Sequence, residues 1–310
     1  MTLEPNVSLV IPVYQSAAVL PLLYQRINDT MSSMEEDFEL ILVDDGSTDD
    51  GWVAMQELRS QDQRVRIVRL TRNFGQHNAL MCGLSFARGQ YILTLDDDLQ
   101  NPPEEIPKLT QAMDQANADV IFGIPKQRQQ NFLRKTGSAL FSKILSVGYH
   151  QRGKLKISNV VLMRKTALES ILDVRSINPV VGLLLLEATD RIEMVAIEHH
   201  HPQQEKTRYS FVRLLNTFTN GIMYHSSLPL KGVLFLGLAC FGISITLGML
   251  YLILYVCGSL TVPGWTTLVL LILLFSGINM ISLGIIGEYL YRILQETRGA
   301  TPYIIREKDV

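Results

Sequence analysis

The chain has 310 residues, of which 47% are hydrophobic and 19% are charged, and its formal net charge is −2. Its mean hydropathy of +0.16 is high for a soluble protein, and the excess is concentrated towards the C-terminus. The 3 cysteines are scattered, which argues against a disulfide framework, and the first residues lack the basic and apolar segments of a signal peptide.

The first 125 residues alternate between strand-like and helix-like patterns. Strands are expected at 7–13, 38–43, 65–70, 91–95 and 119–122, and helices at 17–31, 49–59 and 78–88. Because parallel strands need helical crossovers, this alternation predicts an α/β fold with a mostly parallel sheet covered on both faces.

Beyond residue 125 the pattern changes to amphipathic helices and basic side chains. Residues 131–148 and 210–224 carry apolar side chains at helical spacing. For either helix alone, packing on the sheet is the simpler interpretation. The segment 126–165 holds ten basic and no acidic residues, whereas residues 1–125 hold 8 basic and 19 acidic ones. Because this basic segment precedes apolar spans, we expect an interfacial helix there. We also expect the segment to bind an anionic membrane leaflet or a phosphate; the alternative partner, nucleic acid, is disfavoured by the spans.

Two uncharged segments follow, at 233–257 and 258–287. Each is long enough to cross about 30 Å of hydrocarbon as a helix, so we expect two transmembrane helices; the alternative is a buried helical hairpin. The connecting loop has no basic residue, and the flanks do: Lys231, Arg292, Arg298, Arg306 and Lys308. The positive-inside rule then predicts that both termini are cytoplasmic.

These segments predict three parts. An α/β domain with interfacial helices covers 1–227, a transmembrane hairpin covers 228–292, and a cytoplasmic tail covers 293–310. The amphipathic helices beside the spans make a homo-oligomer plausible.

Three consecutive carboxylates, Asp96-Asp97-Asp98, follow the fourth expected strand. Adjacent like charges are costly unless a cation neutralises them, and Mg²⁺ or Mn²⁺ takes oxygen ligands and bridges to substrate phosphates. The carboxyl edge of an open α/β sheet is where ligands bind. The alternative is an acidic loop ahead of the helix start at Pro102-Pro103-Glu104-Glu105.

A second acidic motif, Asp44-Asp45-Gly46-Ser47, closes the second expected strand. Carboxylates at a strand end accept hydrogen bonds from a nucleobase or ribose, although Asp-Gly alone is ordinary turn chemistry. Together the two motifs predict a crevice with a base-recognising wall and a metal-diphosphate wall. Dinucleotide-binding, P-loop and serine-hydrolase motifs are absent from the sequence.

The sequence resembles glycosyltransferase family 2 enzymes of the polyprenyl-phosphate type. In particular it is similar to undecaprenyl-phosphate 4-deoxy-4-formamido-L-arabinose transferases and, more distantly, to dolichyl-phosphate mannose synthases. The matching segments run nearly from end to end: Val10–Tyr14, Val43–Ser47, Arg72–His77, Thr94–Asp96, Asp98–Pro107, Phe132–Thr136, Lys206–Phe211 and Gly287–Leu290.

This resemblance implies a GT-A (Rossmann-like) catalytic domain. It also implies inverting transfer of one sugar from a nucleotide-sugar, expected to be UDP-linked, to undecaprenyl phosphate. The reaction would occur on the cytoplasmic face of the bacterial inner membrane, for lipopolysaccharide or other cell-envelope glycan biosynthesis.

By position, Pro12, Tyr14 and Asp44 or Asp45 would hold the nucleoside. Asp96 would face the ribose or diphosphate and join Asp98 and Gln100 at the metal.

The acceptor and lid residues follow from the same resemblance. Arg128, Arg134 and Ser138 are candidates for binding the lipid phosphate, and Lys206, Arg208 and Tyr209 would lie on a loop that closes over the donor. The expected catalytic residues are Asp96, Asp98, Arg134 and Arg208. The leaving diphosphate needs cations, and the anionic acceptor hardly needs a general base, for which Asp98 is the default.

Two segments depart from the family pattern. Gln15-Ser16 stands where the family has Asn-Glu, so a carboxylate that would contact the base or sugar is missing. Ile157–Met163 has neither the Asp nor the Gly usual there, which bears on sugar specificity.

Three further features are given supporting interpretations. Adjacent histidines on an extended chain point in alternating directions, so His199-His200-His201 are expected to be partly exposed near the membrane-facing loop rather than one metal site. His77 is expected at a helix start lining the donor cleft. Glu288 is expected to pair with Arg292.

Two rival functions remain. A processive synthase usually carries Gln-x-x-Arg-Trp and more spans, whereas Lys206-Thr207-Arg208-Tyr209 stands here. A non-catalytic membrane scaffold is disfavoured by the intact set of Asp96, Asp98 and Gln100.

Overall fold

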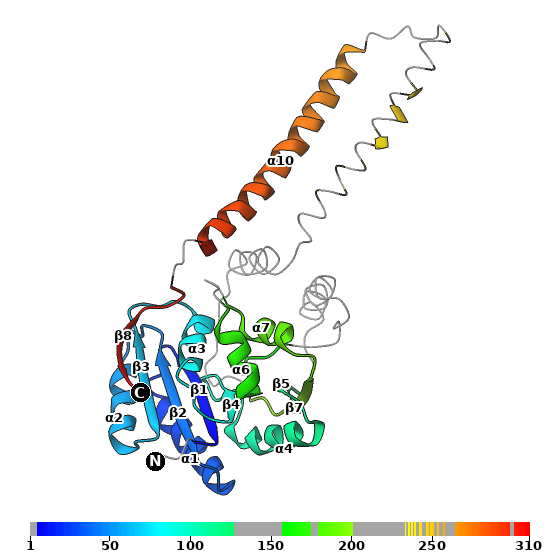
Figure 1. Ribbon diagram of the computed structural model, residues 1–310. Helices are drawn as coiled ribbons and strands as arrows, with labels where there is room; N and C mark the ends of the chain where they lie inside the picture. The colour runs from blue at the N-terminus through cyan, green and yellow to red at the C-terminus, as the bar shows by residue number, and fades with distance from the viewer. Residues whose placement is uncertain are drawn as a thin grey trace. The chain divides into compact units, whose positions relative to one another are not determined.

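The computed structural model describes residues 5–126, 157–174, 179–200, 265–297 and 301–310, together with scattered residues between 233 and 264 (Figure 1). The chain forms two compact units. One contains residues 1–130, 155–206 and 298–310, and the other contains 131–154 and 207–297. The two predicted amphipathic helices, at 131–148 and 210–224, lie outside the described residues.

The first unit is built on a sheet of 8 strands in the order β7-β5-β6-β4-β1-β2-β3-β8. Their bounds are β1 (Val7–Val13), β2 (Phe38–Asp44), β3 (Val65–Leu70), β4 (Tyr91–Thr94), β5 (Val120–Pro125), β6 (Val161–Arg164), β7 (Ile192–Ile197) and β8 (Ile305–Asp309). Strands β1 to β4 are parallel to one another and β5 is parallel to β7. The predicted α/β fold with a mostly parallel sheet is confirmed. The exceptions are β6, antiparallel to β4 and β5, and β8, antiparallel to β3.

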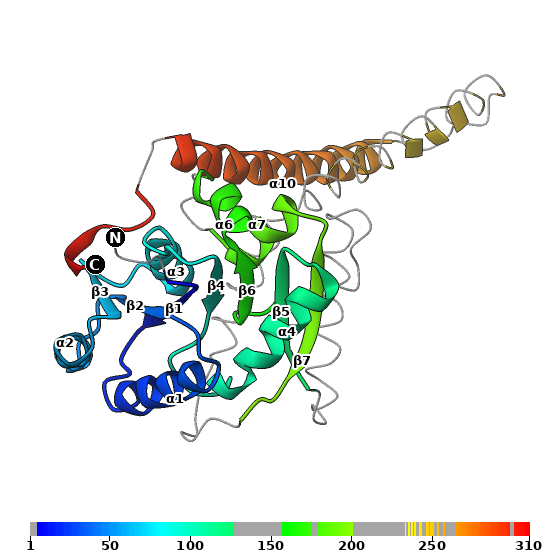
Figure 2. The ribbon, with the colours of Figure 1, turned by 60° about the horizontal axis from the view of Figure 1, so that its bottom comes forward.

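Helices cover both faces of this sheet (Figures 1 and 2). Helices α1 (Leu20–Ser33), α2 (Gly51–Gln61) and α4 (Ile106–Ala116), with the short η1 (Pro103–Glu105), lie on one face. Helices α3 (Gln76–Leu84), α6 (Lys165–Leu172) and α7 (Val181–Ala188) lie on the other. Strands β1 and β2 are therefore buried along their whole length, which is why they read as nearly continuous apolar runs.

Helix α3 packs unusually close to the sheet because of a glycine. A Cβ atom added at Gly83 would lie 2.4 Å from Cγ1 of Val10 and 3.0 Å from Cγ2 of Val43. Only a residue without a side chain allows this approach. The packing directs the first turn of α3 towards the carboxyl ends of β1 and β2, where the predicted site lies.

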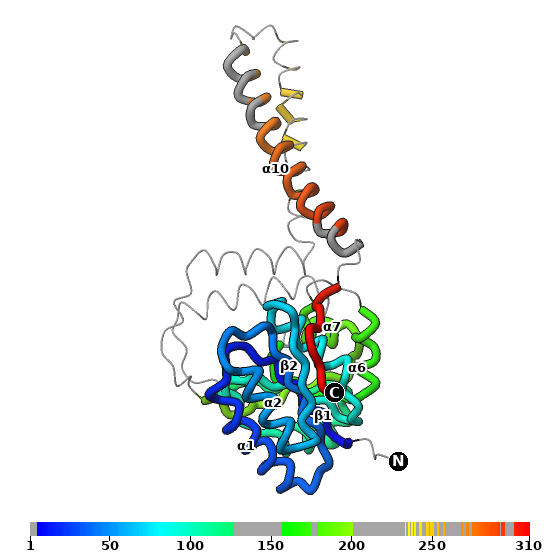
Figure 3. Tube along the Cα trace, turned by 90° about the vertical axis from the view of Figure 1, so that its left-hand side faces the viewer, coloured from blue at the N-terminus to red at the C-terminus, as the bar shows by residue number. Residues whose placement is uncertain are grey.

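The C-terminal residues, which the sequence assigns to a tail over 293–310, contain an edge strand of the sheet (Figure 3). Strand β8 pairs with β3, with Lys308 opposite Val68, and the Thr71 N–H donates to the Ile304 carbonyl at 2.9 Å. The strand is mostly charged and exposed, as expected at an edge, so it lacks the alternation that would have predicted it.

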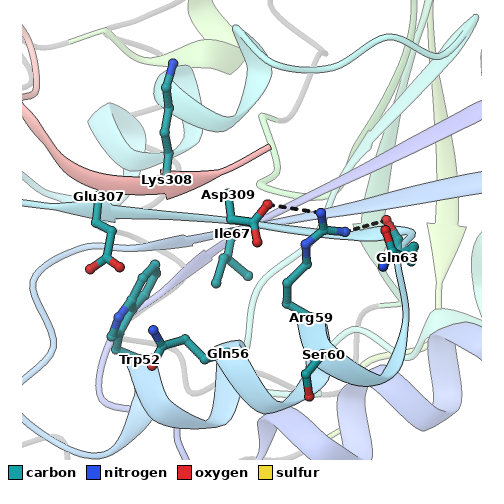
Figure 4. Close-up of a pocket in the computed structure, with 9 residues that line it drawn as sticks. All are labelled: Trp52, Gln56, Arg59, Ser60, Gln63, Ile67, Glu307, Lys308 and Asp309. Carbon is teal, nitrogen blue, oxygen red and sulfur yellow. Dashed lines mark hydrogen bonds and ion pairs between the residues drawn. The ribbon is translucent and has the colours of Figure 1, made fainter.

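A pocket of about 360 Å³ lies between α2, β3 and β8 (Figure 4). Its lining includes Trp52, Ile67 and Lys308, and the guanidinium of Arg59 crosses it to reach Asp309 at 3.0 Å. None of the predicted site residues lines this pocket.

The second unit contains helix α10 (Trp265–Thr297), which covers most of the second uncharged segment. Within the part of the chain that the structure describes, no helix satisfies both the length and the hydropathy of a membrane span. The predicted transmembrane hairpin is thus not confirmed.

Candidate active site

The predicted site residues come from the carboxyl ends of three adjacent strands. In the order β4-β1-β2-β3, the chain winds outwards from β1 in both directions, so β1 and β4 flank a topological switch point. Open α/β sheets bind ligands in the crevice outside the strand ends at this point. Tyr14 follows β1, Asp44 ends β2 and Asp45 follows it, and the three consecutive carboxylates follow β4.

The turn after β1 is tied to both of its neighbours. The Asp97 carboxylate reaches across from β4, and its Oδ2 accepts the Tyr14 N–H at 3.0 Å and the Ser16 hydroxyl at 2.6 Å. Gln15 between them has φ of 56°, in the left-handed region that a side chain disfavours. Its N–H donates to Oγ of Ser47 at 3.1 Å, which holds this conformation from the β2 side. The sequence places Asp97 in the acidic run but predicts no role of its own for it.

Pro12 lies within β1 and is buried, whereas Tyr14 is 44% exposed just beyond the strand end. An exposed aromatic ring beside the strand ends is suited to stacking on a flat ligand group.

Asp44 and Asp45 are buried and hold the loops around them. Asp44 Oδ1 accepts the Ser47 N–H at 2.8 Å, and its Oδ2 lies 3.2 Å from Nε of Arg69. The Asp45 carboxylate accepts the N–H groups of Phe74 and Gly75, at 2.7 and 2.9 Å, in the loop before α3. Burial raises the pKa of Asp45, and these two N–H groups partly offset the rise.

The Asp96 carboxylate is held by amide side chains from three segments. Oδ1 accepts from Gln76 at 2.5 Å and from Asn159 at 3.3 Å, while Oδ2 accepts from Asn101 at 3.3 Å. Burial, and then the negative charges of Asp98 and Asp97, raise the pKa of Asp96 to about 6. The structure thus adds three amides that the sequence analysis did not name.

Asn159 belongs to the segment that departs from the family pattern, Ile157–Met163. Its carbonyl also accepts the hydroxyl of Thr94, in β4, at 2.6 Å. The departure therefore lies against Asp96 itself, to which the Asn159 side chain donates. That departure was the sequence signal that could have identified Asn159 as a site residue.

Asp98 and Gln100 lie together on the exposed turn that follows. The Gln100 N–H donates to Asp98 Oδ1 at 3.0 Å, and the Gln100 side-chain amide donates to Asp98 Oδ2. Leu99 between them has φ of 58°. The turn therefore presents a carboxylate and a carboxamide at the same place.

The side-chain oxygens of Asp96, Asp98 and Gln100 are ligands that suit a hard divalent cation. Burial and, after it, the charge of Asp98 raise the pKa of Asp96, and a bound cation would offset both effects. Among the described residues, no group of three or more His, Cys, Asp or Glu side chains is arranged to hold a metal ion. Mg²⁺ in particular needs only one or two protein carboxylates when substrate phosphates complete its shell. The residues fit a cation that substrate oxygens would complete.

The histidine tract approaches this turn. The His200 N–H donates to the Gln100 carbonyl at 2.8 Å, and Nδ1 of His199 lies 3.0 Å from Oδ1 of Asn101. Both are exposed, as predicted for this tract. His77 is partly buried in the first turn of α3, at the helix start that the sequence predicts for it. His201 lies outside the described residues.

The remaining predicted site residues all lie outside the described part of the chain: Arg128, Arg134, Ser138, Lys206, Arg208 and Tyr209. The side chain of Arg292, the expected partner of Glu288, is also not described.

Known proteins share both the sequence and the fold. Residues 8–171 match the family model described as "Glycosyl transferase family 2". The undecaprenyl-phosphate 4-deoxy-4-formamido-L-arabinose transferase of Proteus mirabilis (strain HI4320) is 30% identical over 305 residues, covering 97% of this chain and 93% of the relative. The uncharacterized glycosyltransferase YkcC of Bacillus subtilis (strain 168) is 30% identical over 303 residues, with the same coverage of 97% and 93%.

A solved structure supports the fold. Glucosyl-3-phosphoglycerate synthase from Mycobacterium tuberculosis, in complex with Mn²⁺ and UDP-glucose, superposes with a TM-score of 0.51 at 17% identity, covering 71% of this chain and 77% of that one. With the family match over residues 8–171 and two relatives aligned along nearly the whole chain, the resemblance expected from the motifs is confirmed: this chain is a glycosyltransferase with a GT-A-like fold and belongs to glycosyl transferase family 2.

Proposed function

We propose that this glycosyltransferase transfers one sugar from a UDP-linked donor to undecaprenyl phosphate, with inversion at the anomeric carbon. The observation that carries the proposal is the position of Asp96, Asp97 and Asp98 after β4, at the switch point of the sheet, where Asp97 also contacts the turn after β1. A nucleotide diphosphate is the ligand class that such a crevice, with carboxylates ready to share a cation with phosphates, suits best.

The donor end of the site is assigned from the strand ends. Pro12 and Tyr14 would contact the nucleoside, the tyrosine by its exposed ring. Asp44 and Asp45 would shape that contact through the loops they hold. The solved relative in fold has UDP-glucose and Mn²⁺ bound, which agrees with this choice of donor class.

Asp96, Asp98 and Gln100 would hold Mg²⁺ or Mn²⁺. When bound, the cation supplies positive charge that stabilises the leaving diphosphate. The chain's own contribution is to orient the carboxylates. Three amides fix Asp96, and the turn at Leu99 brings the Gln100 side chain back to Asp98. Asp96 and Asp98 are therefore the catalytic candidates on the described side of the site.

The acceptor is assigned from similarity and charge. The Proteus relative, aligned over 97% of this chain, is named for undecaprenyl phosphate. The segment 126–165 carries ten basic and no acidic residues. Within it, Arg128, Arg134 and Ser138 would bind the lipid phosphate, since guanidinium groups match phosphate oxygens in pairs.

The reaction needs no proton abstraction. A phosphate oxygen of the acceptor forms the new bond to the anomeric carbon, and the bond from that carbon to the diphosphate oxygen breaks, so UDP leaves with the bonding electrons. Lys206 and Arg208 would add positive charge near the leaving group. Because the acceptor oxygen is already anionic, no general base is assigned.

A membrane location completes the proposal. Its support is the sequence, with uncharged segments at 233–257 and 258–287 and basic flanks. The organisation into residues 1–227, 228–292 and 293–310, with the catalytic part on the cytoplasmic face of the bacterial inner membrane, is part of this proposal. So are a homo-oligomeric state and a role in cell-envelope glycan biosynthesis.

The test uses membranes containing the full-length protein. They are incubated with undecaprenyl phosphate and a panel of radiolabelled UDP- and GDP-sugars, and the lipid is extracted. We expect label in the lipid from one UDP-sugar, and none from the Asp98→Ala variant. The matched control is Asp114→Ala, because Asp114 bonds to Tyr91 at the opposite, amino end of β4. Transfer that survives Asp98→Ala unchanged would show that this site does not produce the label, and a non-catalytic scaffold beside another transferase in the membranes would then be the better account.

A further inference from the structure

The turn after β1 carries no negative charge of its own. Its first residues are Tyr14, Gln15 and Ser16, and the carboxylate that contacts them in the described structure is Asp97, from the opposite side of the switch point. The next residue, Ala17, donates its N–H to Oδ2 of Asp49 at 3.0 Å. The charge at this place in the crevice is thus supplied by a different strand.

The side chains at positions 16 and 97 are in direct contact. Oγ of Ser16 lies 2.6 Å from Oδ2 of Asp97, so the side chain at position 16 points at the carboxylate. A longer acidic side chain at position 16 would bring its own carboxylate to the place that Asp97 now occupies. Two carboxylates at this separation would repel each other, so only one of the two positions can comfortably be acidic.

We propose that Asp97 is a donor-positioning residue, which supplies from the end of β4 the carboxylate that the residues Tyr14, Gln15 and Ser16 after β1 lack. This inference rests on the proposed function, because it names a residue that would help bind the nucleotide-sugar donor. The ligand class is a nucleoside diphosphate, whose nucleoside hydroxyl groups are the donors that a carboxylate accepts.

Two features of the contact support positioning rather than simple loop closure. First, Asp97 accepts from both the backbone of Tyr14 and the side chain of Ser16, so it fixes the backbone from which the Tyr14 side chain extends. Second, an ionised carboxylate has about four acceptor positions, and these contacts do not use them all. The partly exposed Asp97 therefore keeps acceptor capacity at the mouth of the crevice.

The experiment compares four variants of the full-length protein in detergent or nanodiscs: Asp97→Ala, Asp97→Asn, Ser16→Glu and the double variant Ser16→Glu/Asp97→Ala. Binding of UDP in the presence of Mn²⁺ is measured by isothermal titration calorimetry, and thermal unfolding is followed on the same samples. Asp119→Ala is the matched control, because Asp119 also accepts a hydroxyl across two segments, from Thr189 at 2.8 Å, but at the amino end of β5.

We expect Asp97→Ala to weaken UDP binding by about tenfold or more, the range for a lost hydrogen bond to a charged group. Ser16→Glu alone should also weaken binding, because it brings a second carboxylate beside the first. The double variant should bind UDP better than either single variant. Asp97→Asn should keep the unfolding temperature and still lose affinity, since an amide preserves the shape and removes the charge. Asp119→Ala should leave UDP binding unchanged.

Three results would overturn the inference: Asp97→Asn binding UDP as the wild type does, Asp119→Ala losing as much affinity as Asp97→Ala, or a double variant whose loss is the product of the two single losses. If the wild-type protein binds no UDP at all, the proposed function fails. The contact between Asp97 and the side chain at position 16 is then tested by thermal unfolding alone. In that case Ser16→Glu must lower the unfolding temperature less in the Asp97→Ala background than in the wild type, and equal losses would refute the juxtaposition.

Discussion

Removing Glu39 is expected to destabilise the catalytic unit strongly, because its carboxylate is the centre of a buried network. Oε2 of Glu39 lies 2.6 Å from the Arg66 guanidinium, and both side chains are 7% exposed. Oε1 accepts the Ser8 hydroxyl at 2.6 Å and the Arg88 N–H at 2.8 Å. The network therefore joins β1, β2 and β3 to the turn before β4.

The magnitude follows from what remains after Glu39→Ala. The Arg66 guanidinium would stay buried with no counter-charge, and its Nε already lacks a hydrogen-bond partner among the described residues. Breaking a buried pair in this way typically costs about 3–5 kcal/mol. At about 2–4 °C per kcal/mol for a chain of this order of size, the unfolding temperature should fall by roughly 6–20 °C.

The assay is thermal unfolding of the purified full-length protein, followed by intrinsic fluorescence. Replacing both partners by apolar residues, in Glu39→Leu/Arg66→Met, should recover a large part of the loss because no unpaired charge remains. A fall of less than about 2 °C for Glu39→Ala, or a double variant no better than the single one, would refute the reasoning from the buried charge.

Three further predictions concern the position and chemistry of the site. Gly83→Val should lower the unfolding temperature and weaken UDP binding, because the new side chain would push α3 away from Val10. Overpacking of this kind costs about 1–3 kcal/mol. An unchanged unfolding temperature would contradict the close approach of α3 to the sheet. Gln76→Ala should reduce transfer by roughly tenfold through the lost 2.5 Å contact with Asp96, with little change in unfolding temperature; wild-type kinetics would contradict it. The pKa of Asp96 is raised to about 6, so a proton competes with Mn²⁺ for this carboxylate as the pH drops through that value. Mn²⁺ affinity measured by calorimetry should therefore be highest above this pH and fall below it. A flat affinity profile between pH 5 and about 7 would contradict this.

The parallel half of the fold could be predicted because its strands are buried on both faces. Residues 7–13 and 65–70 were expected as strands and form β1 and β3 with those bounds. Strands β6 and β8 are not long apolar runs and are harder to recognise. β6 is a short antiparallel strand inserted between β4 and β5, and β8 is a charged edge strand, so neither has a pattern that distinguishes it from a loop.

The acidic members of the site could be predicted for a similar reason. Runs of carboxylates at strand ends stand out in a sequence, and both motifs lie at the expected edge of the sheet. Their partners do not stand out. Gln76 and Asn159 reach Asp96 from segments 20 and 63 residues away in the sequence, and an isolated amide gives no signal until the chain is folded. Asp97 belongs to the predicted acidic run, but the sequence does not show that it contacts Tyr14 and Ser16.

The central claim is that the carboxylates after β4 hold a divalent cation together with a nucleoside diphosphate. The most direct measurement is Mn²⁺ binding by electron paramagnetic resonance, with and without UDP, on the wild-type protein and on Asp98→Ala. We predict that UDP tightens Mn²⁺ binding to the wild type, with one ion bound per chain, and that Asp98→Ala abolishes this UDP-dependent site. Identical Mn²⁺ binding by the two proteins in the presence of UDP would contradict the account.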